Sequence, residues 1–145
     1  MLSCFEKKKS LQVLSGSAVN KNLKSYDGKR LNLVLEFTFR EFNRPIELTE
    51  IARLANLTPQ AFCKYFKTRT RKTYIQFLNE IRIQYAVRLL NKDEESIASI
   101  AYQSGFINLS HFNRTFKAST EMTPRDFLKQ ADFRINVLGT TFSAE

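Results

Sequence analysis

The 145-residue sequence has no tryptophan and little glycine, proline, cysteine or histidine. Its 4 Gly and 3 Pro are too few for a chain built on hairpin turns, so their scarcity favours helices over strands. The 2 Cys, Cys4 and Cys63, lie far apart and match neither a disulfide framework nor a zinc site. No second His, Asp or Cys flanks His111, the single histidine, at the spacing of metal ligands, so we expect no metal site. No nucleophile, base and orienting group assemble from these residues, so we expect no enzyme, and we expect no cofactor.

Long apolar runs and acidic residues are also scarce. No apolar stretch approaches the roughly 18 residues that a membrane span requires, and no signal peptide follows the early lysines, so we expect no membrane partner. The 14 Asp and Glu face 23 Lys and Arg, which gives a net charge of +9. This balance favours an acidic partner such as nucleic acid. The hydrophobic fraction of 43% is that of a globular protein, and the few cysteines suit a reducing, cytoplasmic setting.

One sequence pattern occurs twice, and this duplication is the most informative feature of the chain. An Ile-Ala pair is followed in each copy by two phenylalanines four positions apart. The copies contain Ile51, Ala52, Phe62 and Phe66, and then Ile100, Ala101, Phe112 and Phe116. The offset is 49 at the front and 50 at the back, so the second copy has one extra residue in its middle. Each copy predicts a short helix, a tight turn and a second helix.

Helical periodicity predicts an all-α fold in which two helix-turn-helix units are joined by a long helix. Asp27 is expected to cap a helix from about Lys29 to Phe42. Further helix starts are marked by the capping residues Thr58 (followed by Pro59), Ser96, Asn108 and Thr123 (followed by Pro124). The predicted divisions are a tail or stub of an upstream domain over 1–26, the first subdomain over 27–72, the linker helix over 73–91, the second subdomain over 92–132 and a tail over 133–145.

A helix-turn-helix needs a small apolar first helix, a turn residue that tolerates positive φ, and a second helix with one buried and one polar face. Asn56 and Gly105 are the expected turn residues. If the phenylalanines point inward, the second helices present two outward stripes at helical spacing. These are Gln60, Cys63, Lys64 and Lys67 in the first copy, and Ser110, Asn113, Arg114 and Lys117 in the second.

The charge pattern and the spacing of the two copies both suit double-stranded DNA. Five cations and no acid lie between Pro59 and Lys72, whereas a solvated helix face normally carries both signs. The linker helix should be about 27 Å long at 1.5 Å per residue. Successive major grooves on one side of B-DNA are about 34 Å apart. One chain could therefore place its two second helices in adjacent major grooves.

Five stretches of the chain resemble the AraC/XylS-type bacterial transcription regulators. They are Leu48–Ala52, Phe62–Lys67, Arg82–Leu90, Ser96–Phe106 and Phe112–Lys117. The resemblance covers about residues 29–130 and implies sequence-specific operator binding by seven helices. It departs from the family at the residue after each second helix, where Arg71 and Glu121 replace the usual glycine. A further departure is Glu47, which stands where a Ser or Thr cap is usual.

The resemblance also implies roles for individual residues. Positions matching Gln60, Cys63, Lys64, Ser110, Asn113 and Arg114 face bases in the family, although a cysteine is a weak hydrogen-bonding residue. We expect phosphate contacts from Thr58, Lys67, Arg69, Asn108 and Lys117. His111 could pack or contact DNA, Cys63 is favoured as a small surface residue over a redox sensor, and an internal ion pair with a carboxylate of the first copy is favoured for Arg82.

The sequence therefore predicts a bacterial transcription regulator that binds a double-stranded DNA operator in the cytoplasm, at the nucleoid. RNA polymerase is a candidate second partner. Most family members carry an upstream effector-binding or dimerisation domain, for which this chain is too short, so we favour a fragment over a standalone regulator. The alternative is a protein-interaction or co-regulator module that contacts polymerase or a partner protein, and the salt dependence of binding separates the two.

Overall fold

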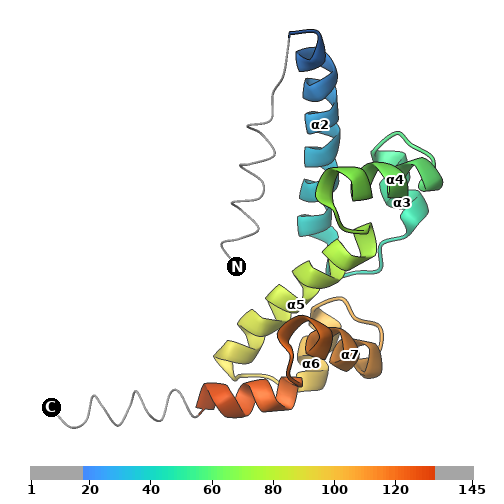
Figure 1. Ribbon diagram of the computed structural model, residues 1–145. Helices are drawn as coiled ribbons and strands as arrows, with labels where there is room; N and C mark the ends of the chain where they lie inside the picture. Colours follow the sequence, from blue (N-terminus) through green and yellow to red (C-terminus); the bar gives the residue numbers. More distant parts are fainter. Residues whose placement is uncertain (1–17, 133–145) are drawn as a thin grey trace, which may run out of the picture. The chain divides into compact units, whose positions relative to one another are not determined.

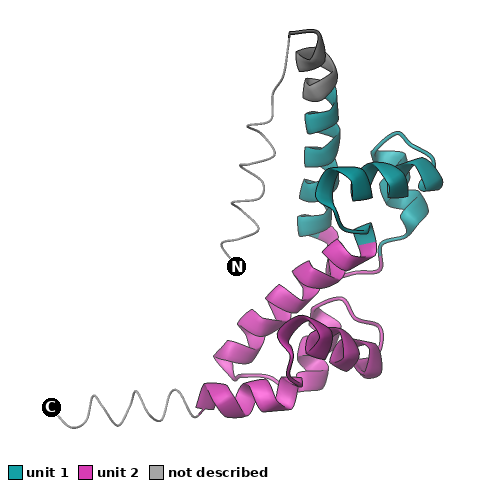
Figure 2. Cartoon of the chain, in the orientation of Figure 1, with its two compact units in different colours: residues 1–40, 46–74 teal, residues 41–45, 75–145 magenta. Residues whose placement is uncertain are grey.

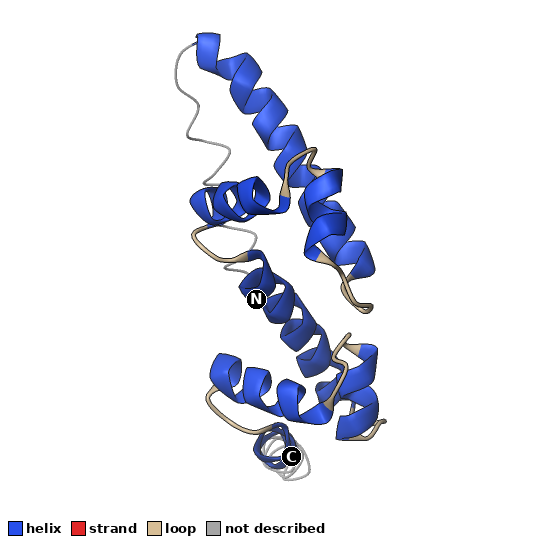
Figure 3. Cartoon of the chain, turned by 90° about the vertical axis from the view of Figure 1, so that its right-hand side faces the viewer, coloured by secondary structure: helices blue, strands red, loops and turns tan. Residues whose placement is uncertain are grey.

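The computed structural model describes the backbone of residues 18–132 and the side chains of residues 26–132. The described chain is helical and contains no strand, which confirms the predicted all-α fold (Figures 1 and 3). The helices are α2 (Ala18–Glu41), α3 (Leu48–Leu54), α4 (Pro59–Thr70), α5 (Tyr74–Lys92), α6 (Ile97–Gln103) and α7 (Leu109–Thr120), followed by a helix over 124–132. Both predicted tails, in their parts 1–17 and 133–145, lie outside the described residues.

The chain divides into two compact units, each built around one copy of the duplicated pattern (Figure 2). Unit 1 comprises residues 1–40 and 46–74, and unit 2 comprises residues 41–45 and 75–145. The long helix predicted for 73–91 is α5, whose first residue belongs to unit 1 and the rest to unit 2. The short segment 41–45 also belongs to unit 2, although it precedes most of unit 1 in the sequence.

The predicted start of the first helix was wrong. Asp27 does not cap a helix but lies inside α2, which begins at Ala18. Gly28, which follows Asp27, is exposed, and a methyl group added there would meet no atom within 4 Å. An exposed glycine costs a helix only about 1 kcal/mol relative to alanine. Asp27 also contacts α4, since its carbonyl accepts a hydrogen bond from Tyr65 and its carboxylate pairs with Arg69.

The core of unit 1 is aromatic with one buried polar bond. Phe62 and Phe66 of α4 are fully buried, and Tyr74 packs edge-on against both rings, with centroids 5.4 and 5.3 Å away. The Tyr74 hydroxyl forms a 2.8 Å hydrogen bond with Oγ1 of the buried Thr38, which itself donates to the carbonyl of Val34. This pair joins α2 to the start of α5 without leaving a buried polar atom unpaired.

The core of unit 2 is apolar and contains a longer run of rings. Phe106, Phe112, Phe116 and Phe127 follow one another, with centroids 5.2, 5.6 and 5.8 Å apart. The buried members of this core are Ile83, Ala86, Leu90, Ile100, Ala101, Phe106, Phe112 and Phe116. The inward orientation predicted for both pairs of phenylalanines is therefore confirmed.

Candidate nucleic-acid interface

In unit 1 the turn between α3 and α4 has the left-handed residue that the sequence predicts. Asn56 has φ 57°, and the amide of Leu57 donates to the carbonyl of Ala52 at 2.9 Å. Thr58 then caps α4, because its hydroxyl oxygen accepts a hydrogen bond from the amide of Ala61. The turn is exposed at Asn56, so the asparagine side chain meets no packing constraint. An exposed Asn is one of the few residues that adopts this conformation at low cost.

In unit 2 the turn between α6 and α7 follows the same course with one more residue. Gly105 has φ 93°, and the amide of Phe106 donates to the carbonyl of Ala101 at 3.1 Å. Asn108 caps α7 through its side-chain oxygen, which accepts from the amide of His111 at 2.7 Å. The extra residue of the second copy therefore lies in this turn, between the left-handed glycine and the cap, where Ile107 stands.

Gly105 is favoured in this turn for two reasons: its φ is positive, and neighbouring atoms leave no room for a Cβ. A Cβ atom at Gly105 would lie 2.3 Å from the carbonyl oxygen of Phe42 and 2.8 Å from Nε of Arg82. Arg82 is buried and donates to the carbonyls of Phe42 and Arg44, both at 2.8 Å. Segment 41–45 is thus held against the turn of unit 2. These two hydrogen bonds to backbone carbonyls were not predicted from the sequence, and the ion pair expected for Arg82 stays a prediction.

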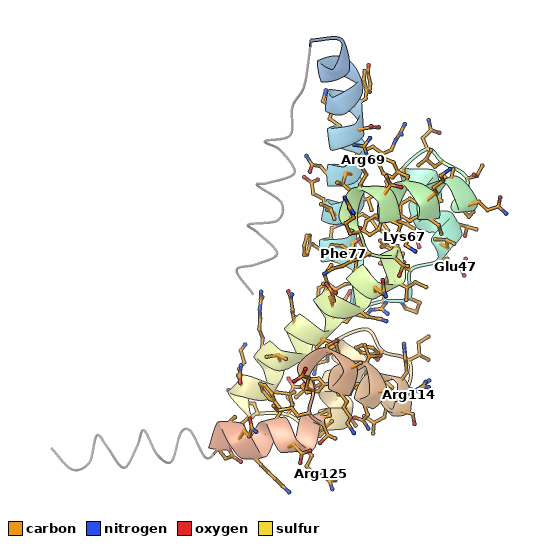
Figure 4. The ribbon with its side chains drawn as sticks, in the orientation of Figure 1. Glu47, Lys67, Arg69, Phe77, Arg114 and Arg125 are labelled. Atoms are coloured by element: carbon orange, nitrogen blue, oxygen red, sulfur yellow. The ribbon has the colours of Figure 1, made fainter. Side chains whose placement is uncertain are left out.

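The second helix of each turn, α4 or α7, is hereafter called the recognition helix. Each buries two phenylalanines completely and exposes its opposite face, as predicted. All the predicted contact residues are exposed: Thr58, Gln60, Cys63, Lys64, Lys67 and Arg69 on α4, and Asn108, Ser110, Asn113, Arg114 and Lys117 on α7. Figure 4 shows Lys67 on α4 and Arg114 reaching out from α7. Neither helix contains an acidic residue.

The two recognition helices end in the same way. Arg71 and Glu121, the residues in place of the usual glycines, both adopt the left-handed conformation with φ 65°. Their amides donate to the carbonyls of Lys67 and Lys117 at 2.9 and 2.8 Å. In each unit the hydroxyl of the threonine one position earlier lies within hydrogen-bond distance of two carbonyls around the turn, to either of which its single hydrogen can be donated. Both turns therefore adopt the left-handed conformation with a residue other than glycine.

One predicted phosphate contact, Arg69, has an internal partner that sequence reasoning missed. Its guanidinium pairs with the carboxylate of Asp27 on α2. The Tyr65 hydroxyl donates to the Asp27 carbonyl at 2.9 Å, and Arg30 and Arg69 each lie 5.7 Å from the Tyr65 ring centroid. Partial burial, followed by the charge of Asp27, raises the pKa of Tyr65 above its usual value. Residues 59–72 contain no acidic residue, and the acidic partner of Arg69 is Asp27 of α2, far away in the sequence.

The remaining candidate residues have plain structural settings. His111 is half-buried and packs edge-on against Phe106 at 5.4 Å, so the packing interpretation has a contact to support it. Cys63 is an exposed free thiol on α4. Among residues whose side chains are described, no group of three or more His, Cys, Asp or Glu could hold a metal ion. Within the same part of the chain, no helix has the length and apolarity needed to cross a membrane.

Two helix-turn-helix units in one chain, each with an acid-free recognition helix open to solvent, define a tandem helix-turn-helix protein. A family model described as a helix-turn-helix domain matches residues 51–130, more than half of the chain. An AraC-type transcriptional regulator from Chromobacterium violaceum has a similar fold, with a TM-score of 0.65 at 22% identity over 72% of this chain and 93% of that structure. The DNA-binding domain of AdpA, determined in complex with a target DNA, gives a TM-score of 0.66 at 20% identity over 70% and 91% of the two chains.

Two curated relatives are longer proteins. The HTH-type transcriptional activator RhaS of Escherichia coli O139:H28 is 30% identical over 122 residues, which cover 84% of this chain and 44% of RhaS. The HTH-type transcriptional regulator GlxA of Rhizobium meliloti is 35% identical over 91 residues, which cover 63% of this chain and 28% of GlxA. The chain thus spans less than half the length of these relatives. It belongs to the AraC-type helix-turn-helix family, as the resemblance predicted.

Proposed function

We propose that this chain binds double-stranded DNA sequence-specifically and regulates transcription, with each recognition helix lying in a major groove. The observation that carries the proposal is the same in both units. A helix without acidic residues presents a polar stripe to solvent, while two fully buried phenylalanines fix its opposite face. A rigid helix with long polar side chains on its exposed face is what a major groove admits.

The base contacts follow from the chemistry of the two stripes. Arg114 and Lys64 can donate to the acceptors of guanine, and Gln60 and Asn113 can pair with adenine. Ser110 can bond to several bases. Cys63 is a weak hydrogen-bonding residue and offers a small, mostly apolar surface. Unit 2 therefore has the side chains with stronger base discrimination, because arginine binds guanine through two parallel hydrogen bonds.

The phosphate contacts come from the edges of the stripes. Lys67 and Lys117 lie one turn beyond the base-reading positions. Thr58 and Asn108 use their side-chain oxygens as acceptors for the helix cap, so the hydroxyl hydrogen and the amide group can still donate to a phosphate. Helix N-termini also favour anions. Arg69 is the weakest of the five, since a phosphate there competes with Asp27.

The wider role of the chain follows from its relatives. Because they are more than twice as long as the matched region, we propose that DNA binding here is coupled to an effector-binding or dimerisation domain. RNA polymerase is the proposed second partner, and the proposed location is the nucleoid in the cytoplasm.

Selection of bound sites from random double-stranded DNA tests this proposal. We expect a defined site, with protection in a footprint extending over two adjacent major grooves. The logarithm of the binding constant should fall linearly with the logarithm of the salt concentration, with a slope near −0.9 for each phosphate contacted. Absence of any selected sequence, or binding that ignores salt, would point instead to the protein-interaction module.

A further inference from the structure

We propose that Ile107, supported by Leu109, reads the 5-methyl group of a thymine at the leading edge of the recognition helix of unit 2. This inference rests on the proposed DNA binding and names a specificity determinant within it. Ile107 is the most exposed large apolar side chain of the described residues, at 75%, and Leu109 is 36% exposed. Both lie at the start of α7, directly before the stripe of Ser110, Asn113 and Arg114.

The backbone holds Ile107 outward from both sides. Its predecessor Phe106 is 2% exposed and packs against the rings of Phe112 and His111, at 5.2 and 5.4 Å. Its successor Asn108 is the cap of α7. A residue between a buried ring and a helix cap has little backbone freedom, and a β-branched side chain is also stiff about χ1. Ile107 is therefore pre-organised as an apolar contact.

The position suits a base contact. The N-terminal residues of a recognition helix are those that reach base edges, and Ile107 immediately precedes them. The thymine methyl is the apolar group that the major groove presents, and an apolar side chain against it distinguishes thymine from cytosine. Removing both surfaces from water on binding is favourable in proportion to the area buried.

Unit 1 has no counterpart of this contact. Its turn is one residue shorter, and between Asn56 and the cap Thr58 it has only Leu57, which is half-buried. The cap is followed by Pro59 rather than by an exposed leucine. The extra residue of the second copy thus has a consequence for recognition, since it places an apolar side chain outside the core.

The test measures coupling between one side chain and one methyl group. The complete chain is bound to its selected site, and each thymine is replaced in turn by deoxyuridine, which lacks only the methyl group. We expect wild-type affinity to fall about three- to ten-fold at one thymine next to the base pair read by Arg114. Ile107→Ala should bind the unmodified site more weakly by the same factor and should be insensitive to deoxyuridine at that position.

Two further variants make the result specific. Ile107→Val should keep most of the methyl effect, whereas Ile75→Ala, which removes an isoleucine of α5 that is 62% exposed, should leave it unchanged. Equal sensitivity to deoxyuridine in wild type and Ile107→Ala, with a site still selected, would overturn this inference alone. Failure to select any DNA site would overturn the proposed function and this inference with it.

Discussion

The turn before each recognition helix contains one left-handed residue, but the surroundings of that residue differ between the two units. In unit 1 the left-handed residue is Asn56, which is exposed. In unit 2 it is Gly105, which is buried beneath the carbonyl of Phe42 and the side chain of Arg82. Both residues have positive φ, but Asn56 is open to solvent, whereas the backbone of Phe42 packs against Gly105. Whether glycine is needed at the left-handed position therefore depends on the atoms packed against it, here the Phe42 carbonyl and the Arg82 side chain, and not on φ alone.

Of the substitutions considered, exchange of the two left-handed turn residues should give the largest difference in stability between the units. Gly105→Asn adds a Cβ where 2.3 Å separates it from an oxygen, so we expect a loss of about 3–5 kcal/mol of stability from strain and overpacking. Asn56→Gly should change stability by less than about 1 kcal/mol. Urea denaturation followed by circular dichroism measures both. Similar losses in the two variants would contradict the interpretation.

Removing Arg82 should have the next largest effect. Arg82→Met keeps most of the side-chain volume but leaves the carbonyls of Phe42 and Arg44 without this donor. Unsatisfied buried acceptors cost about 1–3 kcal/mol each, and we expect a total loss of about 2–4 kcal/mol. In unit 1 the Tyr74 hydroxyl forms a neutral hydrogen bond with Thr38, so Tyr74→Phe should cost about 1 kcal/mol. Arg88→Met, at an exposed position of α5, is the control.

Arg114 of unit 2 and Lys67 of unit 1 should differ in their contacts with DNA, since Arg114 is predicted to contact a base and Lys67 a phosphate. Arg114→Ala should relax the preference at one base pair and cost about 1–3 kcal/mol on the selected site. Lys67→Ala should weaken binding to all sequences about equally and reduce the salt slope by about 1. Randomised-site binding over a salt series measures both. Arg125→Ala, which removes an exposed arginine from the helix over 124–132 (Figure 4), controls for the loss of charge. A selective loss with Lys67→Ala would show that it reads a base.

Where the units are alike, they should respond alike. Arg71 and Glu121 have the same left-handed φ of 65°, which strains any residue with a Cβ. We expect Arg71→Gly and Glu121→Gly each to stabilise the protein by about 0.5–1 kcal/mol after the entropy of glycine is subtracted. Thermal unfolding measures the gain. A difference in sign between the two would show that these turns are not equivalent.

The parts of the fold that the sequence predicted correctly are local. The caps Thr58, Ser96 and Asn108 depend on a hydrogen bond to an amide three residues away. The burial of Phe62 and Phe66, and of their counterparts in unit 2, depends on helical periodicity. The exposure of the predicted contact residues follows from the same period, whereas their individual partners on DNA stay predictions.

The parts that were missed involve residues far apart in the sequence. Asp27 was interpreted as the cap of a helix from about Lys29, yet it lies inside α2 and its carboxylate pairs with Arg69, 42 positions away. The carbonyls that accept hydrogen bonds from Arg82 lie 38 and 40 positions away, and the sequence did not predict them. A backbone carbonyl has no sequence signature, since every residue has one.

The sequence by itself determined the duplicated units, their turn residues, their caps and the polar face of each recognition helix, because these depend on dihedral preferences and on spacings of three or four residues. Tertiary structure alone decided that α2 continues through Gly28, that Arg69 has an acidic partner, and that backbone lies 2.3 Å from where a Cβ of residue 105 would stand. Each of these depends on which atoms of a distant segment approach, and packing fixes that approach only when the whole unit has folded.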